Sequence, residues 1–270
     1  GSIVAYHPEH WYDVGGAGTA IPVSAANSWE RGCAGCHATG VNVLYDTNTS
    51  EYRTWYAQQN VGCEACHGAG ANHAGSSDPD DILNPRDLLD GTAEGVKKAD
   101  LVCGQCHGRG SGDTLPGSPK ALGYPWKEGG SIFPPGNSNI EEYYTWTGSS
   151  GFWQYKENPM GDDPASGNTY LASKKHHQQY LDLIAGPHAP DQLYDGTCMD
   201  CHDAHGNAVK HQIATKVDHG GHLYTDVEND NNKLCLACHN GHGDFESVSA
   251  SDVEAITDAS APPSVVNSTV

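Results

Sequence analysis

Ten cysteines stand in five pairs of the form C-x-x-C, and a histidine directly follows each pair. The pairs are Cys33/Cys36, Cys63/Cys66, Cys103/Cys106, Cys198/Cys201 and Cys235/Cys238, and the histidines are His37, His67, His107, His202 and His239. This arrangement is the attachment signature of a c-type haem. Two thiols about one helical turn apart can both add to the vinyl groups of one porphyrin, and the adjacent histidine becomes the proximal ligand of its iron. The sequence therefore predicts five covalently attached haems.

Other uses of a C-x-x-C pair are a thioredoxin-like redox site, half of a zinc site and a structural disulfide. None of these requires a histidine at the next position, whereas all five pairs have one. No cysteine is left over for a lipid anchor. We expect haem attachment, with zinc or disulfides as the alternative.

Histidine is the expected ligand on the far side of each iron. The chain has two methionines, and Met199 lies inside the fourth cysteine pair, where it cannot reach the far face of that iron. Eleven of the sixteen histidines lie outside the five motifs, enough for one distal ligand per iron. Ligation by two histidines closes the iron to other ligands, and such haems usually occupy the low end of a potential range of about 0.8 V.

Local context ranks the distal candidates. His177 lies on the apolar face of a predicted helix, where a hydrogen-bonded core histidine is the alternative. His205 and His242 each follow a proximal histidine by three residues, so each would serve a neighbouring haem. The other candidates are His73, His188, His10, His222 and His219. We expect His7 and His211 to be solvated or to lie beside a ligand.

The composition predicts an unusual interior. The chain has 33 Gly, 15 Pro and 3 Phe, and only 37% of its residues are hydrophobic. Six Trp and 13 Tyr are too many for a disordered chain. We expect a fold that is mostly irregular or coil, with a few short α-helices wrapped around five haems, little β-structure and a haem-filled core.

The motifs divide the chain into a three-haem and a two-haem part. The expected parts are an N-terminal arm over residues 1–32, a three-haem segment over 33–197, a two-haem segment over 198–245 and a polar acidic tail over 246–270.

Glycine, proline and aromatic residues between 108 and 170 predict extended loops over haem faces. One helix is predicted over residues 170–184, where His177, Tyr180, Leu181 and Ile184 share a face. Gly186 and Pro187 should end it.

Charge and attachment chemistry narrow the partners and the location. The net charge of −20 disfavours nucleic acid and anionic membrane surfaces as partners. The sequence contains no run of eighteen apolar residues, so we expect no membrane-spanning helix. Haem attachment takes place outside the cytoplasm, so we expect an exported protein, periplasmic or extracellular. The chain begins at Gly1 without Met or a signal peptide, and we expect a mature product.

Two weaker motifs remain. Asn48 and Asn267 match the glycosylation sequon, with chance as the alternative. A segment rich in side-chain oxygens suggests a calcium site, with a solvated turn as the alternative. Its members are Asp226, Glu228, Asn229, Asp230 and Asn231.

Residues 33–73 contain C-A-G-C-H-A-T-G and then N-V-G-C-E-A-C-H-G-A-G-A-N-H, and glycine-, proline- and tryptophan-containing sequence follows the third motif. This resembles the tetrahaem cytochrome c family that accepts electrons from hydroxylamine oxidoreductase, over roughly residues 30–200. The resemblance implies that His73 in the G-x-G-x-x-H loop, His177 in a helix after the third motif, and His188 in Gly-Pro-His-Ala are distal ligands.

The chain also departs from that family. The family's first motif is absent, and Y-H-P-E-H-W stands in its place at residues 6–11, while two motifs are added after residue 195. Extracellular cytochrome filaments carry related haem segments and often ligate one haem with a histidine of the adjacent subunit. The arm that holds His7 and His10 resembles that design, and a monomer in which His10 folds back onto its own first haem is the alternative.

These observations predict electron conduction along closely spaced haems, each ligated by two histidines. The partners would be redox proteins or extracellular electron acceptors, and a homopolymer would make the chain the subunit of a conducting filament, or nanowire. The alternative is a multihaem oxidoreductase that acts on a small nitrogen or sulfur compound at one open haem. All five motifs keep their histidine, and 14 Lys and Arg offer few anion-binding groups. We therefore expect no catalytic residue.

Overall fold

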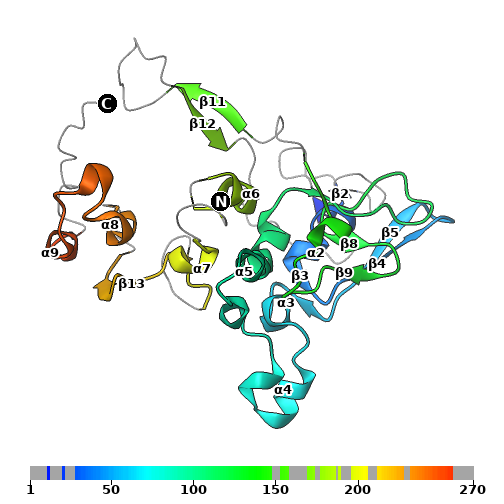
Figure 1. Ribbon diagram of the computed structural model, residues 1–270. Helices are drawn as coiled ribbons and strands as arrows, with labels where there is room; N and C mark the ends of the chain where they lie inside the picture. The colour runs from blue at the N-terminus through cyan, green and yellow to red at the C-terminus, as the bar shows by residue number, and fades with distance from the viewer. Residues whose placement is uncertain are drawn as a thin grey trace. The chain divides into compact units, whose positions relative to one another are not determined.

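The computed structural model describes residues 28–147, 177–186, 188–189, 196–205, 212–227 and 232–257, together with the backbone of four strands at 11–12, 20–21, 153–157 and 169–173 (Figure 1). The chain forms two compact units, Gly1–Asp195 and Gly196–Val270. The division falls between the third and fourth motifs, close to residue 198, where the sequence placed the start of the two-haem segment.

The helices are short, and every motif lies on one. The described helices are α1 Trp29–Gly32, α2 Ala34–His37, α3 Cys63–His67, α4 Ala71–Ser76, α5 Ala93–His107, α6 Gln179–Ala185, α7 Cys198–Cys201, α8 Lys233–His239 and α9 Ala250–Glu254, with short 3₁₀ turns at η1 Pro79–Asp81, η2 Pro85–Leu88, η3 Ile140–Glu142 and η6 Gly243–Phe245. The motifs lie on α2, α3, α5, α7 and α8. In the described part of the chain, no helix has the length and apolar character needed to cross a membrane.

The strands form isolated antiparallel ladders of two. They pair as β1 Trp11–Tyr12 with β2 Ala20–Ile21, β3 Ala38–Thr39 with β6 Gln58–Gln59, β4 Asn42–Asp46 with β5 Glu51–Trp55, β7 Gly110–Ser111 with β10 Thr145–Trp146, β8 Trp126–Lys127 with β9 Ser131–Ile132, β11 Trp153–Glu157 with β12 Thr169–Ser173, and β13 Lys216–His219 with β14 His222–Thr225. The prediction of a mostly irregular chain with short helices and little sheet is confirmed for these residues.

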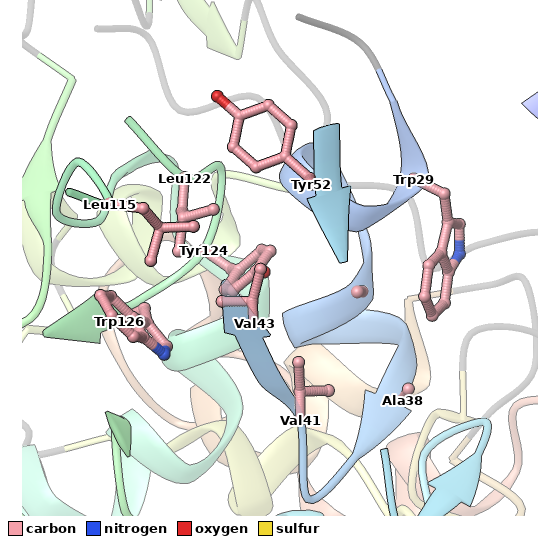
Figure 2. Close-up of a cluster of buried hydrophobic side chains, with 10 residues drawn as sticks. Trp29, Ala38, Val41, Val43, Tyr52, Leu115, Leu122, Tyr124 and Trp126 are labelled. Carbon is pink, nitrogen blue, oxygen red and sulfur yellow. The ribbon is translucent and has the colours of Figure 1, made fainter. Parts of the chain in front are cut away.

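The first unit has an aromatic-rich core around the first motif (Figure 2). It consists of Trp29, Ala34, Ala38, Val41, Val43, Tyr52, Leu115, Leu122, Tyr124 and Trp126. Cys33 and Cys36 pack against it. In the β4–β5 hairpin, Val43 and Tyr52 point inward while Leu44 lies on the exposed face, as the alternation of a half-buried strand requires. The first motif is therefore seated on protein side chains.

Two further clusters hold α5, α6, α8 and α9. One joins α5, α6 and the loops before β10, and consists of Leu101, Phe133, Ile140, Tyr144, Tyr180 and Leu181. The other lies in the second unit and joins the β13–β14 hairpin to α8 and α9, with Val217, Tyr224, Val227, Leu236, Ala237, Val253 and Ile256. Each unit thus has a core of its own.

The helix predicted over residues 170–184 is wrong in its first half. Residues up to Ser173 belong to β12, which pairs with β11, and α6 begins only at Gln179. His177 has a φ of 59°, a left-handed conformation that an α-helix cannot pass through. Tyr180 and Leu181 are buried as expected. The predicted end of the helix is confirmed, because Gly186 caps α6.

The expectation of an unpacked tail over 246–270 is wrong for its first residues. Helix α9 lies there, and a capping box of Ser249 and Asp252 starts it. Val253 and Ile256 are buried in the core of the second unit. Small and acidic residues between these two apolar positions hid the short helix in the sequence. Residues 258–270 lie outside the described part.

Candidate haem-binding sites

Each cysteine pair spans one helical turn, so both thiols project from the same side of the helix. Side-chain caps start two of the helices that carry motifs. Thr92 accepts a hydrogen bond from the Gly95 amide at 3.0 Å at the start of α5. The Thr197 amide donates to the Asp200 carboxylate at 2.8 Å at the start of α7. The motifs are thus pre-formed attachment turns.

The cysteines of these turns are not paired with one another, and burial makes several of their thiols hard to ionise. All ten cysteines lie among the described residues, and none forms a disulfide. Burial raises the pKa of Cys66 to about 11. Burial also raises the pKa of Cys201 to about 11. Both are second cysteines of their pairs, and their burial places the sulfur against the protein.

Several histidines have a ring orientation suited to an iron ligand. Nδ1 of His67 lies 2.6 Å from the Leu83 carbonyl oxygen, and Nδ1 of His73 lies 2.8 Å from the Asp78 carbonyl oxygen. Because a carbonyl oxygen only accepts, each Nδ1 carries the proton and Nε2 is the ring nitrogen with the lone pair. A metal-bound histidine typically donates its second ring nitrogen in this way. These two residues fit a haem iron.

The third motif has a weaker version of the same contact. Nδ1 of His107 lies 3.4 Å from the side-chain oxygen of Gln179, the first residue of α6. The bond is long, but it comes from the helix that follows His177, so one short segment contacts the proximal histidine and provides a candidate distal one.

His177 lies beside two proximal histidines. Its ring centre is 6.4 Å from that of His37 and 6.4 Å from that of His107. A bond between a metal and an imidazole nitrogen is about 2 Å long, so two imidazoles on opposite sides of one iron have ring centres roughly 6 Å apart. The side chain of His177 is exposed, which disagrees with the core-histidine alternative.

The motif glycines pack against aromatic rings, a feature that the sequence analysis missed. A Cβ on Gly35 would collide with the ring of Tyr124, and one on Gly104 would collide with the ring of Tyr180. Tyr124 also donates its hydroxyl to the Glu30 carbonyl at 2.8 Å. Gly35 and Gly104, each between the two cysteines of its motif, are therefore contact points for aromatic side chains distant in sequence.

The three motifs of the first unit lie next to one another, on α2, α3 and α5 (Figure 1). The Cys36 thiol lies 3.9 Å from the Gln105 carbonyl oxygen. The side chain of Gln105 donates to the Ala65 carbonyl at 3.2 Å. The attachment turns of the first three motifs thus meet around residue 105.

In the second unit, an ion pair with a buried ammonium group stands next to the fifth motif. Lys233, the first residue of α8, is 2% exposed, and its Nζ lies 3.7 Å from the carboxylate of Glu254. His222 is the third member, since its Nε2 lies 3.3 Å from the other carboxylate oxygen. Nε2 of His222 therefore contacts Glu254, whereas in His73 the Nδ1 atom makes the protein contact and Nε2 takes no part in that bond.

The other predicted positions are less informative. His188, His205 and His242 lie exposed, and His219 is half-buried in β13. His7, His10, His176 and His211 lie outside the described residues, as do Asn267 and the calcium candidates apart from Asp226. Asn48 is exposed in the turn between β4 and β5. Among the described residues, no group of three or more His, Cys, Asp or Glu is arranged to hold a metal ion directly.

Two families match parts of the chain. Residues 18–68 match the family described as cytochrome c554 and c-prime, and residues 188–244 match the family described as a doubled CXXCH motif. The first match confirms the resemblance to tetrahaem cytochromes over the first two motifs, a shorter stretch than the residues 30–200 expected. No curated protein matches the chain.

Solved structures of two multihaem cytochromes are similar to the chain. One is the outer cell wall cytochrome OcwA, with 24% identity, a TM-score of 0.44, and coverage of 86% of this chain and 49% of that one. The other is the undecaheme cytochrome from the S-layer of Carboxydothermus ferrireducens, with 19% identity, a TM-score of 0.35, and coverage of 87% of this chain and 33% of that one. The chain spans about half the length of the first and about a third of the second.

Proposed function

We propose that this chain, a multihaem c-type cytochrome by its family matches, conducts electrons along five haems, each with a histidine on both sides of the iron. The observation that carries the proposal is the 6.4 Å distance from the His177 ring to the rings of His37 and His107. An imidazole at that distance from a proximal histidine occupies the opposite side of the iron and closes it to external ligands. Such an iron suits electron transfer and disfavours substrate turnover.

The chain's own residues have distinct parts in such a site. The cysteine sulfurs bind the porphyrin, the five motif histidines bind the iron on one side, and the haems supply one-electron transfer when bound. Nδ1 bonds such as that of His67 to Leu83 fix the ring and increase its strength as a ligand.

The distal candidates differ in support. His73 and His177 are favoured by ring orientation and distance, and His222 is the least favoured because its Nε2 faces Glu254. His188, His205, His242 and His10 remain candidates from their sequence context alone.

Replacement of His177 tests whether this residue is a distal ligand, as its distance from His37 and His107 indicates. In the oxidised holoprotein, His177→Ala should convert one haem per chain from low spin to high spin in electron paramagnetic resonance spectra. Ile184→Ala, a truncation at an exposed position of α6, is the control and should leave the spectrum unchanged. An unchanged spectrum for His177→Ala would remove His177 from the ligand set.

The number of haems has a separate test. Mass spectrometry of the denatured chain should show five haem additions, because each of the ten thiols belongs to a C-x-x-C-H motif. Replacement of both cysteines of one motif by serine should remove one haem. Fewer than five additions on the native protein would contradict the count.

The location and assembly extend the proposal. We expect an exported protein, periplasmic or extracellular, that passes electrons to redox proteins or to acceptors outside the cell. A homopolymer joined through the N-terminal arm would continue the haem chain between subunits, and an open heterologous contact gives a filament. Deletion of residues 1–11 should then abolish the polymer and expose one iron per subunit. A protein that is monomeric before and after the deletion would refute the joint.

A further inference from the structure

The third motif touches both other motifs of the first unit through a single residue. Gln105 is the second residue between Cys103 and Cys106, and it is 6% exposed. A buried glutamine needs partners for both amide hydrogens, because an unsatisfied buried donor costs about 1–3 kcal/mol. The partners of Gln105 are therefore informative.

Both hydrogens of the Gln105 amide have carbonyl partners. One bond, of 3.0 Å, goes to the Val102 carbonyl in the same helix and fixes the side-chain rotamer. The other, of 3.2 Å, goes to the carbonyl of Ala65, forty residues away. Ala65 has the same place in the second motif that Gln105 has in the third. The amide therefore links the backbones of two attachment turns.

A sulfur contact near residue 105 has a different character. The Cys36 thiol lies 3.9 Å from the Gln105 carbonyl oxygen. This contact needs the thiol hydrogen, which is lost when the sulfur forms a thioether to a haem. The amide bond from Gln105 to Ala65 involves no sulfur and can persist after attachment.

Aromatic rings hold the third motif from other positions. Gly104 packs on the ring of Tyr180, and Gly108, just after the motif, packs on the ring of Trp146. The rings of Trp146 and Tyr180 are themselves 5.5 Å apart. The third motif is thus fixed to α6 and β10 by aromatic packing, and Gln105 links it to the second motif.

We propose that Gln105 is a positioning residue that sets the distance and orientation between the haems of the second and third motifs. The inference rests on the proposed function, because it concerns haems attached at both motifs. Electron tunnelling falls steeply with distance, so the part of the protein is to hold its cofactors at a fixed spacing. A hydrogen bond between the two attachment turns is the shortest route by which the chain can do so.

Two variants of the holoprotein test the proposal. Gln105→Leu keeps the size of the side chain without its donors, and Gln105→Glu places a carboxylate against the Ala65 carbonyl. Gln59→Glu makes the same chemical change at an exposed position of β6 and is the matched control. Haem additions are counted by mass spectrometry, and the coupling between haems is read from the paired positive and negative Soret bands in circular dichroism.

We expect both Gln105 variants to keep five haems and to lose part of the Soret couplet, while Gln59→Glu retains all of it. A general loss of fold would instead lower the haem count. If Gln105→Glu carries fewer than five haems, the Soret couplet of Gln105→Leu is the measurement that tests the proposal. A full couplet in a five-haem Gln105 variant would overturn the proposal.

The proposed function is tested separately by the spin state. A low-spin spectrum with an unchanged couplet in Gln105→Leu refutes only the role of Gln105. A high-spin signal in the unmutated protein refutes the ligation by two histidines, and the Soret couplet then still tests the role of Gln105, which depends only on haems attached at both motifs.

Discussion

The two units secure their motifs by different means. In the first unit, α5 buries eight of its residues, and aromatic rings distant in sequence pack on motif glycines such as Gly35 and Gly104. In the second unit, α7 buries none of its residues, and α8 begins with the buried Lys233. The depth of burial also varies within the first unit, since α3 has no buried residue.

The difference teaches that the attachment signature does not determine its own support. In the first unit the support is apolar and comes from residues after the third motif, such as Tyr124 and Tyr180. In the second unit an apolar cluster that includes Leu236 and Ala237 is joined by an ion pair between Lys233 and Glu254, which α9 contributes after the last motif. The ion pairs of the first unit, such as Lys97 with Glu141, are exposed and have little energetic weight.

Loss of an aromatic support should have the largest effect. Tyr124→Ala removes a fully buried ring and its hydrogen bond to Glu30, and should destabilise the first unit by about 3–5 kcal/mol, as for other large core truncations. Tyr224→Ala should weaken the second unit instead. Denaturant unfolding followed by tryptophan fluorescence and by Soret absorption distinguishes the two variants. Equal loss in both units for either variant would contradict separate cores.

Loss of the Glu254 carboxylate, the partner of the buried Lys233 ammonium, should have an intermediate effect. Glu254→Gln leaves the ammonium of Lys233 buried without a charged partner, and should cost the second unit about 1–3 kcal/mol. Glu141→Gln breaks an exposed pair and is the control, with a cost of at most about 1 kcal/mol. Denaturant unfolding at low and high salt measures both. If the two substitutions cost the same, charge does not support the fifth motif.

The sequence alone predicted the motif helices and the end of α6, because cysteine spacing and the Gly186-Pro187 pair are local signals. It did not predict the start of α6. An apolar face at helical spacing includes His177, but that residue has a left-handed backbone, and single-sequence periodicity does not report φ.

The supports of the motifs were harder to predict because their partners are distant in sequence. Gly35 lies against Tyr124, and Gln105 bonds to Ala65. The sequence does not show whether a glycine between two cysteines is required by a close contact or is merely tolerated there. Helix α9 was missed for another reason, since only Val253 and Ile256 mark its buried side.

Loss of the hydrogen bonds to two ionised carboxylates, Asp252 and Asp90, should have the smallest effect, and here the two units should behave alike. Hydrogen bonds from Ser249 hold the pKa of Asp252 below its ordinary value of 3.8, and those from Thr92 do the same for Asp90 in the first unit. A lowered carboxyl pKa stabilises the fold above pH 3.8, and this contribution is lost as the pH falls through the folded value.

Ser249→Ala and Thr92→Ala therefore test the two caps in parallel. Each variant should lower the unfolding temperature of its own unit near neutral pH, and the difference from the unmutated protein should shrink below pH 3.8. Thermal unfolding as a function of pH provides the measurement. A difference that grows on acidification would contradict a stabilising role for the two ionised carboxylates.

The central claim is that every iron has a histidine on each side. The measurement that tests it most directly is the electron paramagnetic resonance spectrum of the oxidised, unmutated protein with all five haems attached. Ligation by two histidines at every iron predicts low-spin ferric signals with no high-spin component. A high-spin signal equivalent to one haem per chain would contradict the claim and would point to an iron that is open to substrate.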